Sequence, residues 1–156
     1  NAIDKASQVK NRGFYLDFLS LLKKNEVYQT PNTPPIPQIR GLVSQLDYIL
    51  NEEGLANRFK RHKNLGEKVR HWARETGFEM FPEKGYESNT VSTIINNLSL
   101  DIDMMVNNLL NEGYRIVNGY GKLKNKTFRI GHMGELTLNQ LEEMLEVLTN
   151  VISKLK

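Results

Sequence analysis

Arg129 lies in the run KTFRIGHMGELT, which begins at Lys126. Phe128 and Ile130 on either side of it favour a β-strand, and Gly131 lets the backbone turn sharply where that strand would end. An arginine between two apolar residues is costly to bury without a partner, so its side chain either extends to solvent or faces an anion. Its planar guanidinium suits a carboxylate held by two parallel hydrogen bonds. Arg129 is therefore a candidate carboxylate site, with an ordinary surface arginine as the alternative.

A proline-rich stretch, QTPNTPPI, begins at Gln29. Prolines lack the backbone donor and disfavour helical geometry in the residue before them, so residues 30–37 are expected to be extended or turned. Thr30 and Thr33 place hydroxyl groups on this stiff segment. Such hydroxyls can bind phosphate oxygens, and they can equally cap the helix that follows. By composition alone the segment is typical of a linker.

The two segments together resemble one known family. The run GYGKLKNKTFRIGHMGELT, from Gly119 to Thr137, resembles the carboxylate-binding segment of the class V aminotransferases, the alanine-glyoxylate and serine-pyruvate branch of the pyridoxal-phosphate enzymes. QTPNTPPI is similar to the TPxTPP segment with which this family reaches the cofactor phosphate. Both motifs stand in the family's order and at about its separation, and the resemblance covers nearly the whole chain from Phe14 onward.

The resemblance implies a site shared between this chain and a part of the protein upstream. Arg129 would bind the substrate carboxylate, and Thr30 and Thr33 would reach the phosphate of pyridoxal 5′-phosphate across a homodimer interface. The family's Schiff-base lysine and the aspartate beside the pyridine nitrogen belong to the upstream part, so no catalytic residue is expected here. The implied function is that of the C-terminal fragment of a cytoplasmic aminotransferase, which exchanges an amino group between a small amino acid and an oxo acid such as glyoxylate or pyruvate. The fragment alone is expected to be inactive and to bind no cofactor.

Two other functions compete with this one. A non-catalytic interaction domain with an aminotransferase-like small-domain fold would carry the same motifs without an upstream lysine domain. A cysteine desulfurase of the same fold type would need a cysteine nucleophile, and the chain contains no cysteine. The start at Asn1, without a methionine or a signal-like apolar segment, favours a processed or excised piece of a longer protein.

Composition excludes several classes of function. The 156 residues carry a formal charge of +3, a mild excess that does not indicate nucleic acid, and no apolar run approaches membrane-spanning length. The three histidines, His62, His71 and His132, lack metal-ligand spacing, so no metal site is expected. His132 is interpreted as a structural residue or as one that supports a site residue without contacting a ligand. The basic residues between Leu55 and Glu75 could form a nucleic-acid face, but acidic residues interrupt them, which favours a solvated helix face.

Hydrophobic periodicity predicts the elements that position these residues. Helices are expected at 2–11, near 18–24, at 39–50, 55–75 and 102–110, and from 138 onward, where Thr137 and Gln140 form a capping box. The helix at 39–50 is expected to belong to the core. Strands are expected at 78–81, 91–96 and 114–117 and around Arg129. The predicted fold is α+β, with helices packed on a small, mostly antiparallel sheet. Residues 1–37 would form a helical connector left over from the large cofactor domain, and residues 38–156 the small C-terminal domain.

Overall fold

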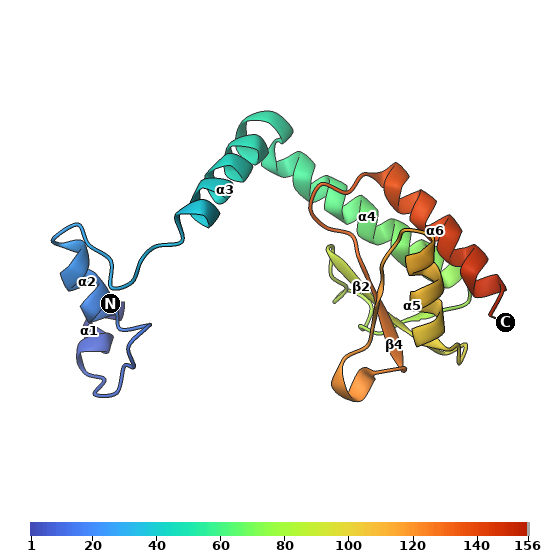
Figure 1. The fold of residues 1–156 in the computed structure, drawn as a ribbon, viewed down its shortest axis with the longest axis horizontal. Coiled ribbons are helices and arrows are strands. Elements are labelled where there is room, and N and C mark those ends of the chain that lie inside the picture. The colour runs from blue at the N-terminus through green and yellow to red at the C-terminus, as the bar shows by residue number, and fades with distance from the viewer. Residues whose placement is uncertain (156) are drawn as a thin grey trace. The chain divides into compact units, whose positions relative to one another are not determined.

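The computed structural model describes residues 1–155, and internal contacts divide the chain into two compact units, Asn1–Tyr48 and a second that begins at Ile49 (Figure 1). The predicted boundary, between residues 37 and 38, lies inside the first unit, within the helix that begins at Ile36. None of the described helices combines the length and the hydropathy needed to cross a bilayer.

Two short helices open the first unit, α1 (Ala2–Ser7) and α2 (Phe18–Asn25). The predicted helix at 2–11 is thus shorter than expected. Arg12 explains the early end, because its Nη1 donates to the carbonyl of Val9 at 2.7 Å and its Nε donates to Asp17 at 2.7 Å. These bonds fold the chain back toward α2, whose N-terminus Asp17 caps.

The third helix of this unit, α3, spans Ile36–Asp47. The prediction that residues 30–37 are not helical is therefore wrong for the last two of them. Pro37 lies in the first helical turn, where a missing backbone N–H leaves no hydrogen bond unmade and the fixed φ suits the helix. Residues 30–35 are non-helical, as expected.

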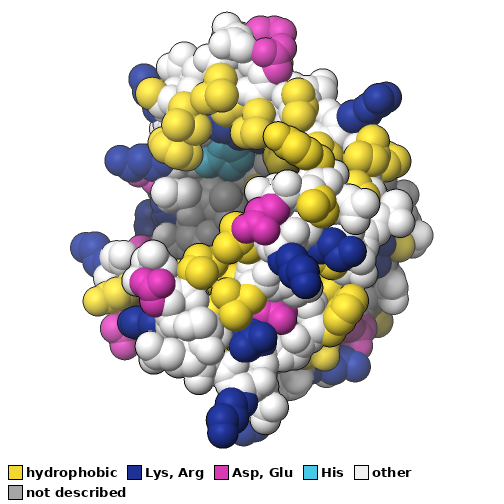
Figure 2. All heavy atoms as spheres, turned by 90° about the vertical axis from the view of Figure 1, so that its left-hand side faces the viewer, with side chains coloured by type: hydrophobic (Ala, Val, Ile, Leu, Met, Phe, Trp, Pro, Cys, Tyr) yellow, Lys and Arg dark blue, Asp and Glu magenta, His cyan; other side chains and the backbone are white. Residues whose placement is uncertain are grey.

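The apolar stripe of α3 contradicts the prediction that this helix belongs to the core. None of its residues is buried, and Leu42 and Leu46 are 57% and 43% exposed. Large hydrophobic side chains elsewhere in the first unit are also exposed, including Phe14 and Tyr28, and Figure 2 shows apolar side chains at the surface. Periodicity identified the apolar face correctly, but it could not show whether the surface that covers this face lies within the chain.

The second unit begins in a π-helix, Tyr48–Glu53, and Gly54 (φ +82°) separates it from α4 (Leu55–Glu75). The strands are β1 (Glu79–Met80), β2 (Val91–Ile95), β3 (Val117–Asn118) and β4 (Thr127–Gly131). Two further helices, α5 (Ile102–Asn111) and α6 (Leu138–Ser153), lie before β3 and after β4. The sheet has the order β1-β2-β4-β3, and every pairing is antiparallel. The α+β class and the antiparallel sheet are confirmed.

The core of the second unit lies between the sheet and its helices. Ile94, Phe128 and Ile130 supply the sheet side and are almost fully buried. Helices α4, α5 and α6 contribute the opposing side chains, Leu65, Val69, Met105, Leu109, Leu141 and Leu148. Figure 1 shows α4 and α6 side by side, and a hydrogen bond from Trp72 Nε1 to Thr149 Oγ1 at 2.9 Å joins the two.

Two predicted strands begin later than expected, for a shared reason. The amide of Phe78 donates to the carbonyl of Ala73 at 2.8 Å, and that of Tyr114 donates to the carbonyl of Leu109 at 3.1 Å. Each amide closes the end of the preceding helix and is therefore unavailable to the sheet. Consequently β1 begins at Glu79 instead of Phe78, and Tyr114 cannot open β3, which begins at Val117.

Candidate functional site

The side chain of Arg129 belongs to the face of the sheet opposite the helices. Its neighbours along β4, Phe128 and Ile130, are buried in the core, and side chains alternate along a strand. Arg129 pairs with Thr93 on β2 and with Val117 on β3, so these three residues form one row across this face. We call it the helix-free face because α4, α5 and α6 all pack on the other one. The predicted strand around Arg129 is confirmed.

The guanidinium of Arg129 is only partly satisfied. Its Nη2 donates to the backbone carbonyl of Asn118 at 3.5 Å, a long hydrogen bond, and its buried Nε has no hydrogen-bond partner among residues 1–155. No carboxylate in the described chain forms an ion pair with it. A half-buried cation with donors to spare can accept an external anion, and its fork of N–H groups fits both oxygens of a carboxylate.

Thr30 and Thr33 lie in the first unit, in the loop between α2 and α3, and both are exposed. The Thr30 hydroxyl donates to the carbonyl of Asn32 at 2.7 Å. A phosphate oxygen would have to replace that carbonyl as the acceptor, because a hydroxyl has a single proton. The role of both threonines in binding a cofactor phosphate stays a prediction.

His132 directly follows β4 and is fully buried. Its Nε2 lies 2.9 Å from Ser92 Oγ, and its backbone amide donates to the carbonyl of Thr90 at 2.8 Å. Helix α4 approaches it closely at Gly66, where a Cβ atom would lie 3.2 Å from the imidazole Cε1. These contacts are those of a packing residue between helix and sheet. Burial lowers the pKa of His132, which keeps the ring neutral in the folded protein.

The buried, neutral His132 predicts a loss of stability in mild acid. In the unfolded chain the imidazole titrates near its ordinary pKa of about 6.5, whereas the folded protein has the lower pKa. The stabilisation is therefore complete above about pH 6.5 and falls below it by at most about 1.4 kcal/mol per pH unit. Urea denaturation between pH 7 and pH 5 should show this fall in the wild type and a shallower one in His132→Gln. Ser92→Ala retains the titrating ring and should keep the steep fall, and parallel curves for wild type and His132→Gln would refute the assignment.

An ion-pair cluster that was not predicted lies beside the loop that follows β4. The carboxylate of Glu53 forms ion pairs with Arg58 Nη1 and Arg61 Nη2, each at 2.7 Å. Arg58 also forms an ion pair with Glu135 at 2.9 Å. Arg61 Nη1 donates to the carbonyls of Gly134 and Leu136. The expected solvated face of α4 is thus wrong for Arg58 and Arg61, whose side chains are only 16% and 24% exposed.

Glu53 is the centre of this cluster. Burial opposes the ionisation of its carboxyl, but the hydrogen bonds from Arg58 and Arg61 outweigh that effect and lower its pKa. The cluster fastens the loop after the Arg129 strand to α4. The contact between Arg58 and Glu135 could not be found from local spacing, because the two residues lie 77 apart in the sequence, whereas Glu53 is only 5 residues from Arg58.

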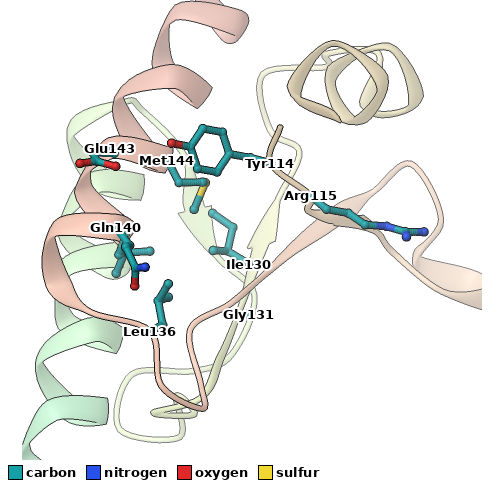
Figure 3. A pocket seen from close by; sticks show the side chains of 9 residues that line it. Tyr114, Arg115, Ile130, Gly131, Leu136, Gln140, Glu143 and Met144 are labelled. Atoms are coloured by element: carbon teal, nitrogen blue, oxygen red, sulfur yellow. The ribbon is translucent and has the colours of Figure 1, made fainter. Parts of the chain in front are cut away.

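A hollow of about 420 Å³ lies on the other side of the sheet, between β4 and α6 (Figure 3). Ile130, Leu136 and Met144 form apolar parts of its lining. Arg115 points away from the hollow in Figure 3, and Gln140 is engaged in capping α6. Its size suits a small ligand, but none of the predicted site residues lines it. The helix-free face around Arg129 is therefore the better candidate site. The described residues hold no group of three or more potential metal ligands.

Comparison with known proteins identifies relatives of one kind. No protein-family model matches the chain. It is 38% identical over 125 residues to an uncharacterised aminotransferase of Methanocaldococcus jannaschii, an alignment that covers 78% of this chain and 32% of that protein. It is 32% identical over 125 residues to a serine–glyoxylate aminotransferase of Methylorubrum extorquens, covering 78% and 31%. The chain thus spans about a third of the length of these relatives.

Solved structures share the fold. An alanine–glyoxylate aminotransferase of Nostoc sp. matches with a TM-score of 0.82 and 28% identity, over 97% of this chain and 41% of that one. An aspartate aminotransferase of Thermus thermophilus matches with a TM-score of 0.81 over 96% of this chain and 42% of its own, at 21% identity, which supports the fold alone.

Proposed function

Because this chain is homologous to the C-terminal domain of the class V, fold-type I aminotransferases, we propose that it belongs to a longer, pyridoxal-phosphate-dependent transaminase. The enzyme would exchange an amino group between a small amino acid and an oxo acid such as glyoxylate or pyruvate. The observation that carries the proposal is Arg129, a half-buried arginine without a carboxylate partner among the described residues, on the helix-free face of the sheet.

In this proposal the chain binds and orients the substrate. Arg129 would hold the carboxylate that amino acids and oxo acids share, with two charge-assisted hydrogen bonds. Val117 and Thr93 flank it, so the row leaves no competing negative charge beside the guanidinium. A fixed carboxylate orients the adjacent α-carbon, where the exchange takes place.

The cofactor would be held largely by other parts of the protein. Pyridoxal phosphate, when bound, supplies the electron sink for transamination. The hydroxyls of Thr30 and Thr33 have the donor chemistry that a phosphate requires, and we propose that they contact it in a homodimer. None of the described lysines is buried. This exposure supports the proposal that the catalytic lysine lies in another part of the protein. Lys68, which is only partly exposed, is paired with Glu142 at 2.6 Å.

The experiment compares the full-length protein with the 156-residue chain. With pyridoxal phosphate, a small amino acid and glyoxylate or pyruvate, the full-length protein should transaminate and the chain alone should not. Borohydride treatment of the chain with pyridoxal phosphate should trap no single lysine in stoichiometric yield, since none of its described lysines is buried in a pocket that would make it react in preference to the others. A specifically trapped lysine in the chain would contradict the proposal, and so would a full-length protein without transaminase activity.

A further inference from the structure

The side chain of Asn118, at the end of β3, joins three segments of the second unit. Its Nδ2 donates to Asp103 Oδ1 on α5 at 2.8 Å and to Asn125 Oδ1 at 2.7 Å. Its Oδ1 accepts from the backbone amide of Asn125 at 2.9 Å. We call Asp103, Asn118 and Asn125 the asparagine clasp. It ties helix α5 and strand β3 to the loop that leads into β4.

The clasp holds the loop between β3 and β4, whose backbone follows a tight turn. Asn125 has a left-handed backbone (φ +61°), and its carbonyl accepts from Asn96 Nδ2 at 3.1 Å. At Gly119 a Cβ atom would overlap the carbonyl of Leu123, so the chain crosses itself too closely for any side chain. The loop is therefore fixed from both ends, and Asn118 is its anchor on the side of β3.

Asn118 also contacts Arg129 directly. Its backbone carbonyl lies 3.5 Å from Arg129 Nη2 and is the one hydrogen-bond acceptor that the described chain gives to this guanidinium. That contact is already long, so a small displacement of the carbonyl would remove it. Strand β3 has only two residues and lies at the edge of the sheet, so its ladder gives the carbonyl little support. The hydrogen bonds of the Asn118 side chain therefore hold its backbone carbonyl in place where the short strand does not.

We propose that Asn118 is a positioning residue for the substrate-binding arginine. Through the asparagine clasp, its side chain fixes the carbonyl that directs the guanidinium of Arg129 toward the substrate carboxylate. The inference rests on the proposed function and goes beyond it, because Asn118 itself need not touch the substrate.

The test uses the full-length enzyme and a matched asparagine. Asn97 supports the other edge of the sheet in the same way, because its Nδ2 donates to Gly77 O at 2.8 Å and its Oδ1 accepts from Glu79 N at 3.2 Å. Asn118→Ala and Asn97→Ala should lower the melting temperature similarly. Only Asn118→Ala should raise KM for amino acid substrates, by a factor on the order of ten. This factor is smaller than the roughly hundredfold loss of activity that a misplacement of about 1 Å can cause. The KM for decarboxylated amines should stay unchanged.

Two further variants keep the test decisive if Asn118→Ala folds poorly. Asn125→Gly accommodates the left-handed backbone and removes one clasp bond, so KM for amino acids should rise by a smaller factor. The double variant Asn118→Asp/Asp103→Asn exchanges the donor and the acceptor of the bond between these two residues. The side-chain amide of Asn125 can rotate so that its NH2 group donates to the new carboxylate. KM for amino acids should therefore lie closer to the wild-type value than it does in Asn118→Ala.

The outcomes separate this inference from the proposed function. If the wild type transaminates and Arg129→Lys impairs amino acid binding, but Asn118→Ala behaves like Asn97→Ala, the clasp is merely structural and the inference is overturned. An unchanged ratio of amino acid to amine KM in both Asn118→Ala and Asn125→Gly overturns it as well. If Arg129→Lys is itself without effect, the proposed role of Arg129 has failed, and the inference falls with it.

Discussion

Arg129→Ala in the full-length protein is expected to weaken the binding of amino acid substrates by at least about tenfold. A hydrogen bond to a charged group contributes roughly 1.5 to 3 kcal/mol, and every 1.4 kcal/mol or so changes affinity tenfold. Arg129→Lys keeps the charge but loses the fork, so its affinity should lie between those of wild type and Arg129→Ala. Cofactor absorbance should persist in both variants, and turnover of decarboxylated amines should change little. Substrate titrations monitored by initial rate would measure these effects.

Arg115→Ala is the matched control for this experiment. Arg115 is exposed, belongs to the same unit, and points away from the hollow that it borders. Its removal should leave affinity for amino acids unchanged. If Arg129→Ala lowers the melting temperature and cofactor retention but leaves the ratio of amino acid to amine turnover unaltered, Arg129 is a structural residue and does not bind substrate.

Phe128→Ala should destabilise the second unit by about 3 to 5 kcal/mol, the usual loss when a buried phenylalanine is truncated. Phe128 is fully buried beside Arg129, and its ring packs edge-on against Phe78 with the ring centroids 5.2 Å apart. Urea denaturation followed by the fluorescence of Trp72, the sole tryptophan, would measure the change. Phe128→Leu leaves a smaller cavity, so its free energy of unfolding should fall by clearly less than that of Phe128→Ala. A loss below about 1 kcal/mol for Phe128→Ala would show that this part of the core is not the close-packed interior described above.

The sequence predicted best those elements whose packing partners lie within the chain. The predicted helix from Leu55 to about Glu75 agrees with α4, and the capping box of Thr137 and Gln140 at the start of α6 is present, because periodicity and capping are local signals. The same periodicity wrongly placed α3 in a core, since it identifies an apolar face without identifying what covers it. The late start of β3 was also unpredictable, because an amide bound to a helix terminus leaves no mark on the residue pattern.

The candidate site was predicted in part. The residue types around Arg129 predicted its strand, and the register confirms it. Its connection to Asn118 could not be predicted, since a backbone carbonyl carries no sequence signature and the clasp unites residues from α5, β3 and a loop. In the ion-pair cluster around Glu53, the contact of Arg58 with Glu135 could not be predicted for the same reason, because charges distant in sequence meet only after folding.

The position of Trp72 determines which part of the molecule tryptophan fluorescence can follow. The indole lies in the second unit, hydrogen-bonded to Thr149, while the first unit contains no tryptophan. A melt followed by tryptophan fluorescence alone is therefore blind to residues 1–48, and its midpoint belongs to the α+β domain alone. Far-ultraviolet circular dichroism registers the helices of both units, so a difference between the two transitions would measure how far α1, α2 and α3 unfold independently. Because the chain has no cysteine, one engineered thiol in the first unit would give a fluorescent label a unique attachment point and make that transition visible as well.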